Sequence, residues 1–278
     1  MDTTPKSLSH LAAHQEAYCQ RLRALPYYNL VAPVVEAFLR QIVDRGAFYL
    51  RVHLPTLRLI LESGRIKSVT ETGKGATEGG AETRREVTEA LFGCKASKLL
   101  PSEFPKYGFL SQPDPHLDLV VNGSMWAQYG DVSIQLRKER LFHRTTLCVG
   151  NSVDFGRCYM LVPTRVDDIK ATCLCGLPHD GEPLIHLQDP IFCYAKLTEW
   201  IMKREITVDN FPNIDSIAEG MPPLFEFFEL QYHGDLDLSK DVERIDAIPS
   251  SDEERATLEE LKPKFEAVGV PLFIDEAL

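Results

Sequence analysis

The sequence predicts a protein of the α+β class, because helical patterns fill most of the first third of the chain and strand patterns gather later. Apolar residues recur at helical spacing through much of the first 92 residues. Between residues 129 and 162, and again between 224 and 238, the composition and alternation are those of strands with one buried face. A doubly wound parallel sheet would instead alternate helices and strands regularly along the chain.

In the first 92 residues, helix ends are marked by proline and glycine. Pro55 suits the first turn of a helix that follows a strand, and Gly64 ends that helix. The elements predicted here are a helix beginning at Leu8, helices over 31–46, 56–63 and 81–92, a strand over 47–53 and a polar, glycine-containing loop over 68–80.

Later in the chain, an aromatic-rich strand is followed by an exposed helix. Ser251 and Glu254 have the spacing of a capping box at the start of that helix. The elements predicted here are strands over 129–136, 145–149, 158–162, 224–234 and 236–238, and helices over 166–173, 194–203 and 250–263. We therefore divide the chain into an N-terminal helical segment (1–46), a catalytic domain (47–248) and a C-terminal helix and tail (249–278).

The overall composition excludes several classes of protein. The chain has 278 residues and a net charge of −11, which argues against a general binder of nucleic-acid backbones. It has no apolar stretch of signal-peptide or membrane-span type, and its seven cysteines do not suggest a disulfide framework. We expect a protein made in the cytoplasm and not bound to membranes. Secretion systems that leave the N-terminus unprocessed keep delivery into another cell open.

A metal site is not expected. Cys173, Cys175 and His179 have the residue types of zinc ligands, with Cys158, His186 or Cys193 as further candidates. Paired knuckles of the kind found in structural zinc sites are absent, so buried free thiols are the favoured interpretation.

A first candidate site element is the end of the 47–53 strand. Arg51 and His53 share one face of this strand, beside the N-terminus of the next helix. Two cationic or hydrogen-bonding side chains at a helix N-terminus suit a diphosphate. The alternative is a surface arginine and a histidine at the edge of the core.

A second element surrounds the 145–149 strand. Thr145 and Thr146 begin it, Arg144 precedes it and Ser152 follows it. Their hydroxyls suit a ribose or the bracing of a carboxylate, although threonine is also simply a good strand residue.

The third element is the polar face of the aromatic strand, formed by Glu229, Gln231 and His233. An unpaired carboxylate is costly in such surroundings, so Glu229 either lies in a cleft or pairs with an arginine. In a cleft it would stabilise an oxocarbenium-like centre.

Together these elements resemble the ADP-ribosyltransferase fold, with its split β-sheet, in their order along the chain. The matching stretches are YLRVHLPTLRLILESGRIKS, HRTTLCVGNS and FELQYHGDLDLSKDVERI. With SVTETG, TEALFG, FPKYGFL and YGDVSIQL, the chain also resembles a bacterial domain family that includes CteC-type effectors, enzymes that attach ADP-ribose to a threonine of ubiquitin. The resemblance covers roughly residues 45–245.

The resemblance implies a role for each candidate residue. Glu229 would be the catalytic carboxylate, unless the motif is aligned so that Gln231 takes that position. NAD would be the co-substrate and no metal would be needed. The remaining roles are gripping NAD (Arg51 or His53, with Arg144 in reserve), propping the carboxylate (Thr145, Thr146), contacting ribose (Ser152) and stacking on nicotinamide (Tyr107, Tyr129, Phe228).

The resemblance also implies an activity. Arginine-modifying members carry Gln or Glu where this chain has Phe227, which argues against arginine as the acceptor and is compatible with a hydroxyl acceptor. The leading hypothesis is a mono-ADP-ribosyltransferase effector acting on a protein, with a threonine of ubiquitin as the implied acceptor. The alternatives are an NAD glycohydrolase and an inactive binding module of the same fold.

Overall fold

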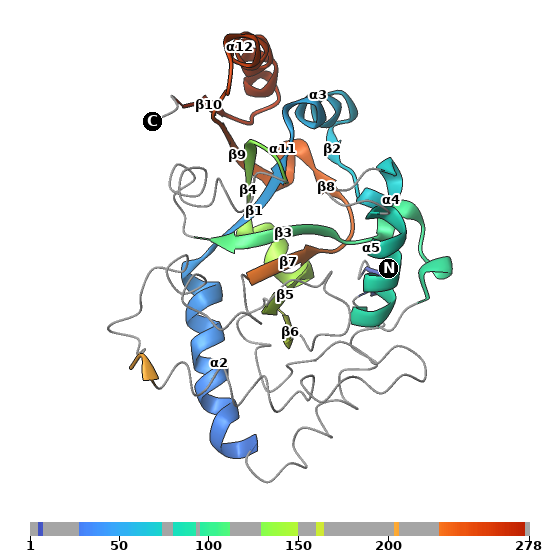
Figure 1. The fold of residues 1–278 in the computed structure, drawn as a ribbon, viewed down its shortest axis with the longest axis vertical. Helices are drawn as coiled ribbons and strands as arrows, with labels where there is room; N and C mark the ends of the chain where they lie inside the picture. The colour runs from blue at the N-terminus through green and yellow to red at the C-terminus, as the bar shows by residue number, and fades with distance from the viewer. Residues whose placement is uncertain are drawn as a thin grey trace.

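The computed structural model describes residues 5–7, 28–73, 80–92, 95–111, 129–149, 160–163, 203–205 and 228–275. In these residues the predicted α+β class is confirmed: one large sheet with helices around it (Figure 1). The helices of four or more residues are α2 (Tyr28–Arg45), α3 (Leu54–Ser63), α4 (Val69–Thr72), α5 (Gly80–Phe92), α8 (Lys138–Leu141), α11 (Leu238–Asp241) and α12 (Asp252–Ala267). The strands are β1 (Ala47–Val52), β2 (Arg65–Ile66), β3 (Lys106–Ser111), β4 (Val132–Leu136), β5 (Thr145–Val149), β6 (Met160–Pro163), β7 (Phe228–Tyr232), β8 (Leu236–Asp237), β9 (Val242–Ala247) and β10 (Leu272–Ile274).

The large sheet is split near its middle. Its strand order is β10-β9-β4-β1-β3-β7-β5-β6, with only β9 and β10 parallel. Strand β1 pairs with β3 only from Ala47 to Tyr49, but pairs with β4 as far as Val52. The two halves therefore diverge beyond Tyr49 (Figure 1). Near this point the Tyr232 hydroxyl donates to the Tyr49 carbonyl, 3.0 Å away.

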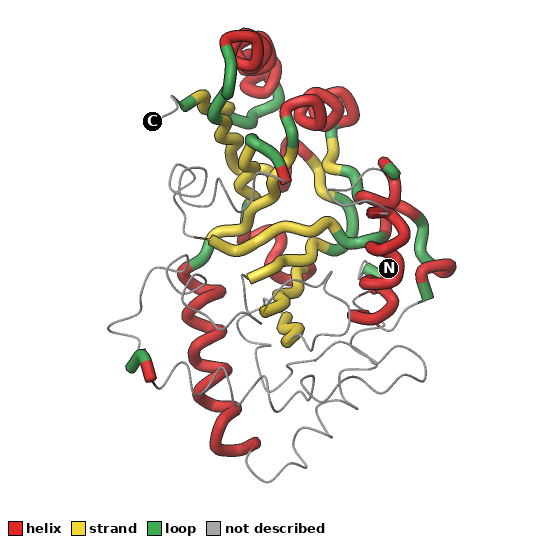
Figure 2. The backbone as a smooth tube through the Cα atoms, in the orientation of Figure 1, coloured by secondary structure: helices red, strands yellow, loops and turns green. Residues whose placement is uncertain are grey.

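One face of the sheet carries the hydrophobic core. Residues at alternate positions of several strands, such as Phe48, Ile134 and Leu230, are fully buried on this face. Helices α2, α3 and α12 contribute the other side of the same core, with residues such as Ile42, Leu57, Ile60, Leu258 and Phe265. Figure 2 shows these helices at the margins of the strands.

The other face of the same strands carries polar side chains. In β7 these are Glu229, Gln231 and His233 just beyond the strand end, and in β5 the residue opposite Gln231 is Thr146. Helix α5 lies over this face, because its Arg84 stacks on Tyr107 of β3 and its Phe92 contacts the His233 ring. The fold thus places the polar face of β7 beneath a helix.

Four strands were not predicted from the sequence: β2, β3, β9 and β10. The predicted loop over 68–80 was wrong at its start, where α4 forms with Ser68 as its N-cap. The Ser68 hydroxyl accepts from the Glu71 amide, and the Glu71 carboxylate accepts from the Ser68 amide, which completes a capping box. The predicted helix at 166–173 lies outside the described residues, and so does the predicted helix at 194–203 except for its last residue.

The division into three parts at residues 46 and 248 stays a prediction. Phe38 from the first part, Phe48 from the second and Leu258 from the third belong to one hydrophobic core. Strand β10, from the third part, extends the same sheet through β9. In the portion of the chain that the structure describes, no helix has the length and apolarity needed to cross a membrane.

Candidate functional site

The candidate site is centred on Glu229, the second residue of β7. This strand lies between β3 and β5, so Glu229 has Phe109 on one side and Cys148 on the other. Glu229 is 3% exposed, and Gln231 and His233 are fully buried. A carboxylate at this depth is stable only if polar groups surround it.

A row of hydrogen bonds leads along the polar face of β7 and ends at the Glu229 carboxylate. The Gln231 amide nitrogen donates to Glu229 Oε1 at 2.7 Å, and the Thr146 hydroxyl donates to Gln231 Oε1 at 2.9 Å. Thr146 Oγ1 also lies 3.0 Å from His233 Nε2, and Ser7 Oγ lies 2.6 Å from His233 Nδ1. Thr146 is therefore connected to Glu229 through Gln231.

Helix α5 supplies a guanidinium from the other direction. Arg84 Nη1 lies 3.9 Å from Glu229 Oε2, and the Arg84 guanidinium lies 3.7 Å above the Tyr107 ring centre. Arg84 was not predicted to be a site residue. Its spacing from Thr88 and Phe92, four residues each, puts all three on one helix face. That periodicity was the available signal, but it does not identify the strand that the face covers.

Two titratable groups near Glu229, namely His233 and Tyr107, are uncharged at neutral pH, mainly because they are buried. Burial, together with the positive charges of Lys106 and Arg144, lowers the pKa of His233 to about 3. Burial raises the pKa of Tyr107 to about 12. At neutral pH the His233 ring is therefore an uncharged hydrogen-bonding group, and Tyr107 keeps its proton.

The turn after β7 is held by two cations. The Arg144 guanidinium donates to the carbonyl of His233 at 2.9 Å, to the carbonyl of Asp235, and to the buried Asp241 carboxylate at 2.9 Å. Lys106 donates to the carbonyls of Ser102, 2.8 Å away, and of the residue after His233, 2.7 Å away. Burial lowers the pKa of Lys106 to about 8.

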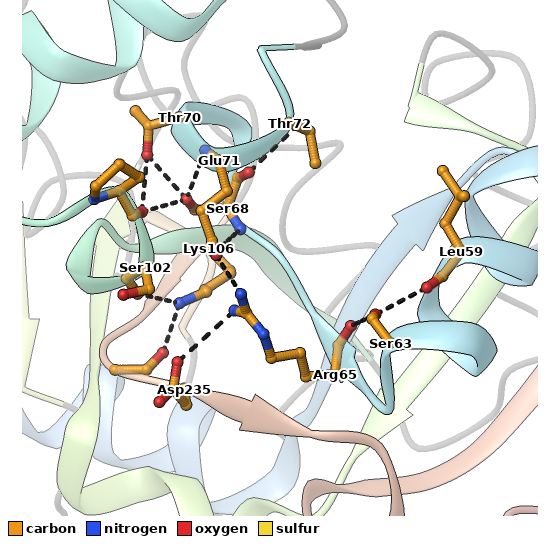
Figure 3. A network of polar contacts seen from close by, with 12 residues as sticks. Leu59, Ser63, Arg65, Ser68, Thr70, Glu71, Thr72, Ser102, Lys106 and Asp235 are labelled. Carbon is orange, nitrogen blue, oxygen red and sulfur yellow. Dashed lines mark hydrogen bonds and ion pairs between the residues drawn. The ribbon is translucent and has the colours of Figure 1, made fainter.

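Figure 3 shows how this turn connects to α4. Lys106 points toward Ser102, and Arg65 reaches between Glu71 and Asp235. The Arg65–Glu71 ion pair is 2.5 Å long and lowers the pKa of the Glu71 carboxyl, in opposition to burial. This network fixes the backbone that follows His233.

The predicted diphosphate residues lie on the other half of the split sheet. Tyr49, Phe109 and Glu229 occupy one row across β1, β3 and β7, and Arg51 lies two residues further along β1 on the same face. Arg51 is half-buried, whereas His53 is exposed at the N-cap of α3.

The other predicted residues are distributed differently. Thr145 lies on the opposite face of β5 from Thr146 and donates to the Leu141 carbonyl at 2.8 Å. Tyr129 packs beside Tyr49 and Phe109. Arg144 donates its hydrogen bonds to the turn after β7 and to Asp241, and Phe228 is buried in the core. Ser152 and the cysteine cluster lie outside the described residues, and no metal-ligand group of three or more His, Cys, Asp or Glu is found within them.

Comparison with solved structures finds several similar chains. Two of them are of Thermus sp. 2.9 DarT, one in complex with ADP-ribosylated single-stranded DNA and one with NAD+. The identity is 10% in each case, over 84% of this chain and 95% and 96% of the DarT chain, with TM-scores of 0.41 and 0.40. No protein-family model matches the sequence, and neither does any curated protein.

Proposed function

We propose that this chain is an ADP-ribosyltransferase that uses NAD and has Glu229 as its catalytic carboxylate. One observation carries the proposal: the buried Glu229 carboxylate accepts a hydrogen bond from Gln231 on the sheet face that also bears Arg51, across the split between the two halves. The residue order along the chain is the one expected from the resemblance to the ADP-ribosyltransferase fold.

The residues fit the chemistry of the bond to be broken. Cleavage of the bond between nicotinamide and ribose leaves the electron pair on nicotinamide and positive charge on the ribose. An ionised carboxylate stabilises that charge, and Arg84 favours the ionised form of Glu229. The acceptor oxygen then bonds to the ribose carbon, and its proton passes to Glu229 or to water. Arg51 would bind the diphosphate as a charge-assisted donor.

The acceptor we propose is a protein hydroxyl, with a threonine of ubiquitin as the first candidate. A net charge of −11 disfavours the phosphate backbone of nucleic acids. DarT has been solved with ADP-ribosylated single-stranded DNA, so single-stranded DNA belongs in the same assay as a second acceptor.

The test uses labelled NAD with the purified chain, ubiquitin, a cell lysate or single-stranded DNA. Glu229→Gln keeps the shape of the side chain and removes its charge, so we expect transfer to fall by roughly 100-fold or more. Glu260→Gln, in an exposed ion pair with Lys264, is the matched control and should retain full transfer.

Four other results would overturn the assignment of Glu229, the proposed acceptor or the transferase activity. Undiminished labelling by Glu229→Gln would refute the assignment of Glu229. Labelled DNA without labelled protein would overturn the proposed acceptor and leave the enzyme class standing. Release of nicotinamide without any labelled acceptor would identify a glycohydrolase, and NAD that stays intact would favour a binding module.

A further inference from the structure

A short N-terminal segment, Pro5–Ser7, lies against the end of β7. Ser7 is fully buried and its hydroxyl lies 2.6 Å from His233, although 226 residues separate the two in sequence. Lys6 forms a 2.9 Å ion pair with Glu103. The ring of Pro5 lies beside Gly234, 3.4 Å from where a β-carbon there would be. The segment is thus fixed at three consecutive residues.

The hydrogen bonds that start at Ser7 can run in only one direction. An ionised Glu229 carboxylate only accepts, so Gln231 must turn its NH₂ group toward it and its oxygen toward Thr146. Thr146 has one proton and donates it to that oxygen, so Thr146 must accept from His233 Nε2.

The tautomer of His233 follows from the same reasoning. A neutral imidazole carries one proton, and here it is on Nε2. His233 Nδ1 is then a bare acceptor, and the Ser7 hydroxyl donates to it. Every donor in the row from Ser7 to Glu229 therefore points toward the carboxylate.

We propose that Ser7 is a positioning residue for Glu229, acting through His233, Thr146 and Gln231, so that the segment Pro5–Ser7 is a built-in part of the site. The role in catalysis rests on the proposed function, whereas the docking and the direction of the hydrogen bonds do not. Without the Ser7 hydroxyl, a buried acceptor on His233 loses its donor, and the ring is free to turn or change tautomer. Thr146 and Gln231 then lose the partner that fixes their own orientations.

The structural test is NMR of the full chain at neutral pH. The imidazole ¹⁵N signals of His233, assigned by their loss in His233→Gln, should show the Nε2–H tautomer. In Ser7→Ala the His233 signals and the side-chain amide signals of Gln231 should both shift. Ser63→Ala removes an exposed hydroxyl that bonds only backbone carbonyls, and should leave both sets unchanged.

The kinetic test uses NAD turnover by the same variants. Loss of one neutral hydrogen bond corresponds to roughly a tenfold loss in rate, so Ser7→Ala should lower kcat about tenfold with little change in KM. Ser7→Thr keeps the hydroxyl and should recover part of the loss.

The proposal fails if His233 is the Nδ1–H tautomer or is protonated at neutral pH. In either case His233 Nδ1 carries a proton and cannot accept a hydrogen bond from the Ser7 hydroxyl. It also fails if the Gln231 signals in Ser7→Ala match those of the unchanged chain, or if kcat is unaffected. A wild-type chain that consumes no NAD would refute the proposed function instead. In that case the Gln231 signals alone decide whether Ser7 sets the orientation of the groups at Glu229.

Discussion

Acid should lower the free energy of unfolding of this protein, because His233 is buried in an uncharged form. Its ring is fully buried, with Ser7 and Thr146 on its two nitrogens and the edge of Phe92 against it. The charged groups that act on the ring are Lys106 and Arg144, and both oppose a further positive charge. The folded protein therefore resists protonating His233, whereas the unfolded chain does not.

The size of the effect follows from the two pKa values. The pKa of His233 is about 3 in the folded protein and 6.5 for an ordinary histidine. Above pH 6.5 His233 is mostly neutral in both the folded and the unfolded state, so its titration does not change the free energy of unfolding. As the pH falls below 6.5, only the unfolded chain takes up a proton, so the free energy of unfolding decreases by about 1.4 kcal/mol per pH unit. Between pH 7.5 and 4.5 the loss is about 3 kcal/mol.

Urea unfolding of the wild type and His233→Gln at pH 7.5, 6.5, 5.5 and 4.5 measures this loss. Glutamine does not titrate, so the variant should be less stable at neutral pH but should lose about 3 kcal/mol less than the wild type on acidification. Leu57→Ala lowers stability through the core without removing a titratable group, and should keep the wild-type pH dependence. Equal acid losses in the wild type and His233→Gln would refute the reasoning.

Two further substitutions test the scaffold of the site. Asp241→Asn removes a buried charge that pairs with Arg144 at 2.9 Å and Arg140 at 3.1 Å, and should lower the free energy of unfolding by about 3 kcal/mol in urea. A loss below about 1 kcal/mol would show that the turn after β7 does not depend on this carboxylate. Gly108→Ala places a β-carbon 2.0 Å from a carbonyl oxygen of β1 and should cost about 3 kcal/mol. Gly64→Ala, with φ +67° but nothing within 4 Å, should cost only about 1 kcal/mol, and equal losses would contradict the close approach at Gly108.

Part of the site could be predicted because alternation is local. Residues two apart in a strand share a face, so Glu229, Gln231 and His233 had to lie together once β7 was recognised. The same rule puts Thr145 and Thr146 on opposite faces of β5, although both were predicted to prop the carboxylate. Which threonine faces Glu229 depends on the pairing of β5 with β7, and that register is not encoded locally.

The missed strands have patterns that differ from regular alternation. In β9 the buried apolar residues Val242, Ile245 and Ala247 are spaced three and then two apart, because the register shifts opposite Gln135 and Leu136 of β4. In β3 a glycine interrupts the apolar run at the point where the strand passes close to β1.

The residues that complete the site come from segments far away in sequence. Arg84 and Ser7 carry no pattern that points to β7, because their roles depend on where α5 and the N-terminal segment pack. The chemistry of Glu229 nevertheless constrains them. A buried carboxylate accepts only, so each group behind it must present a donor, and the last donor must come from outside the strands. Ser7 meets that requirement, which explains why a segment so distant in sequence is buried at His233.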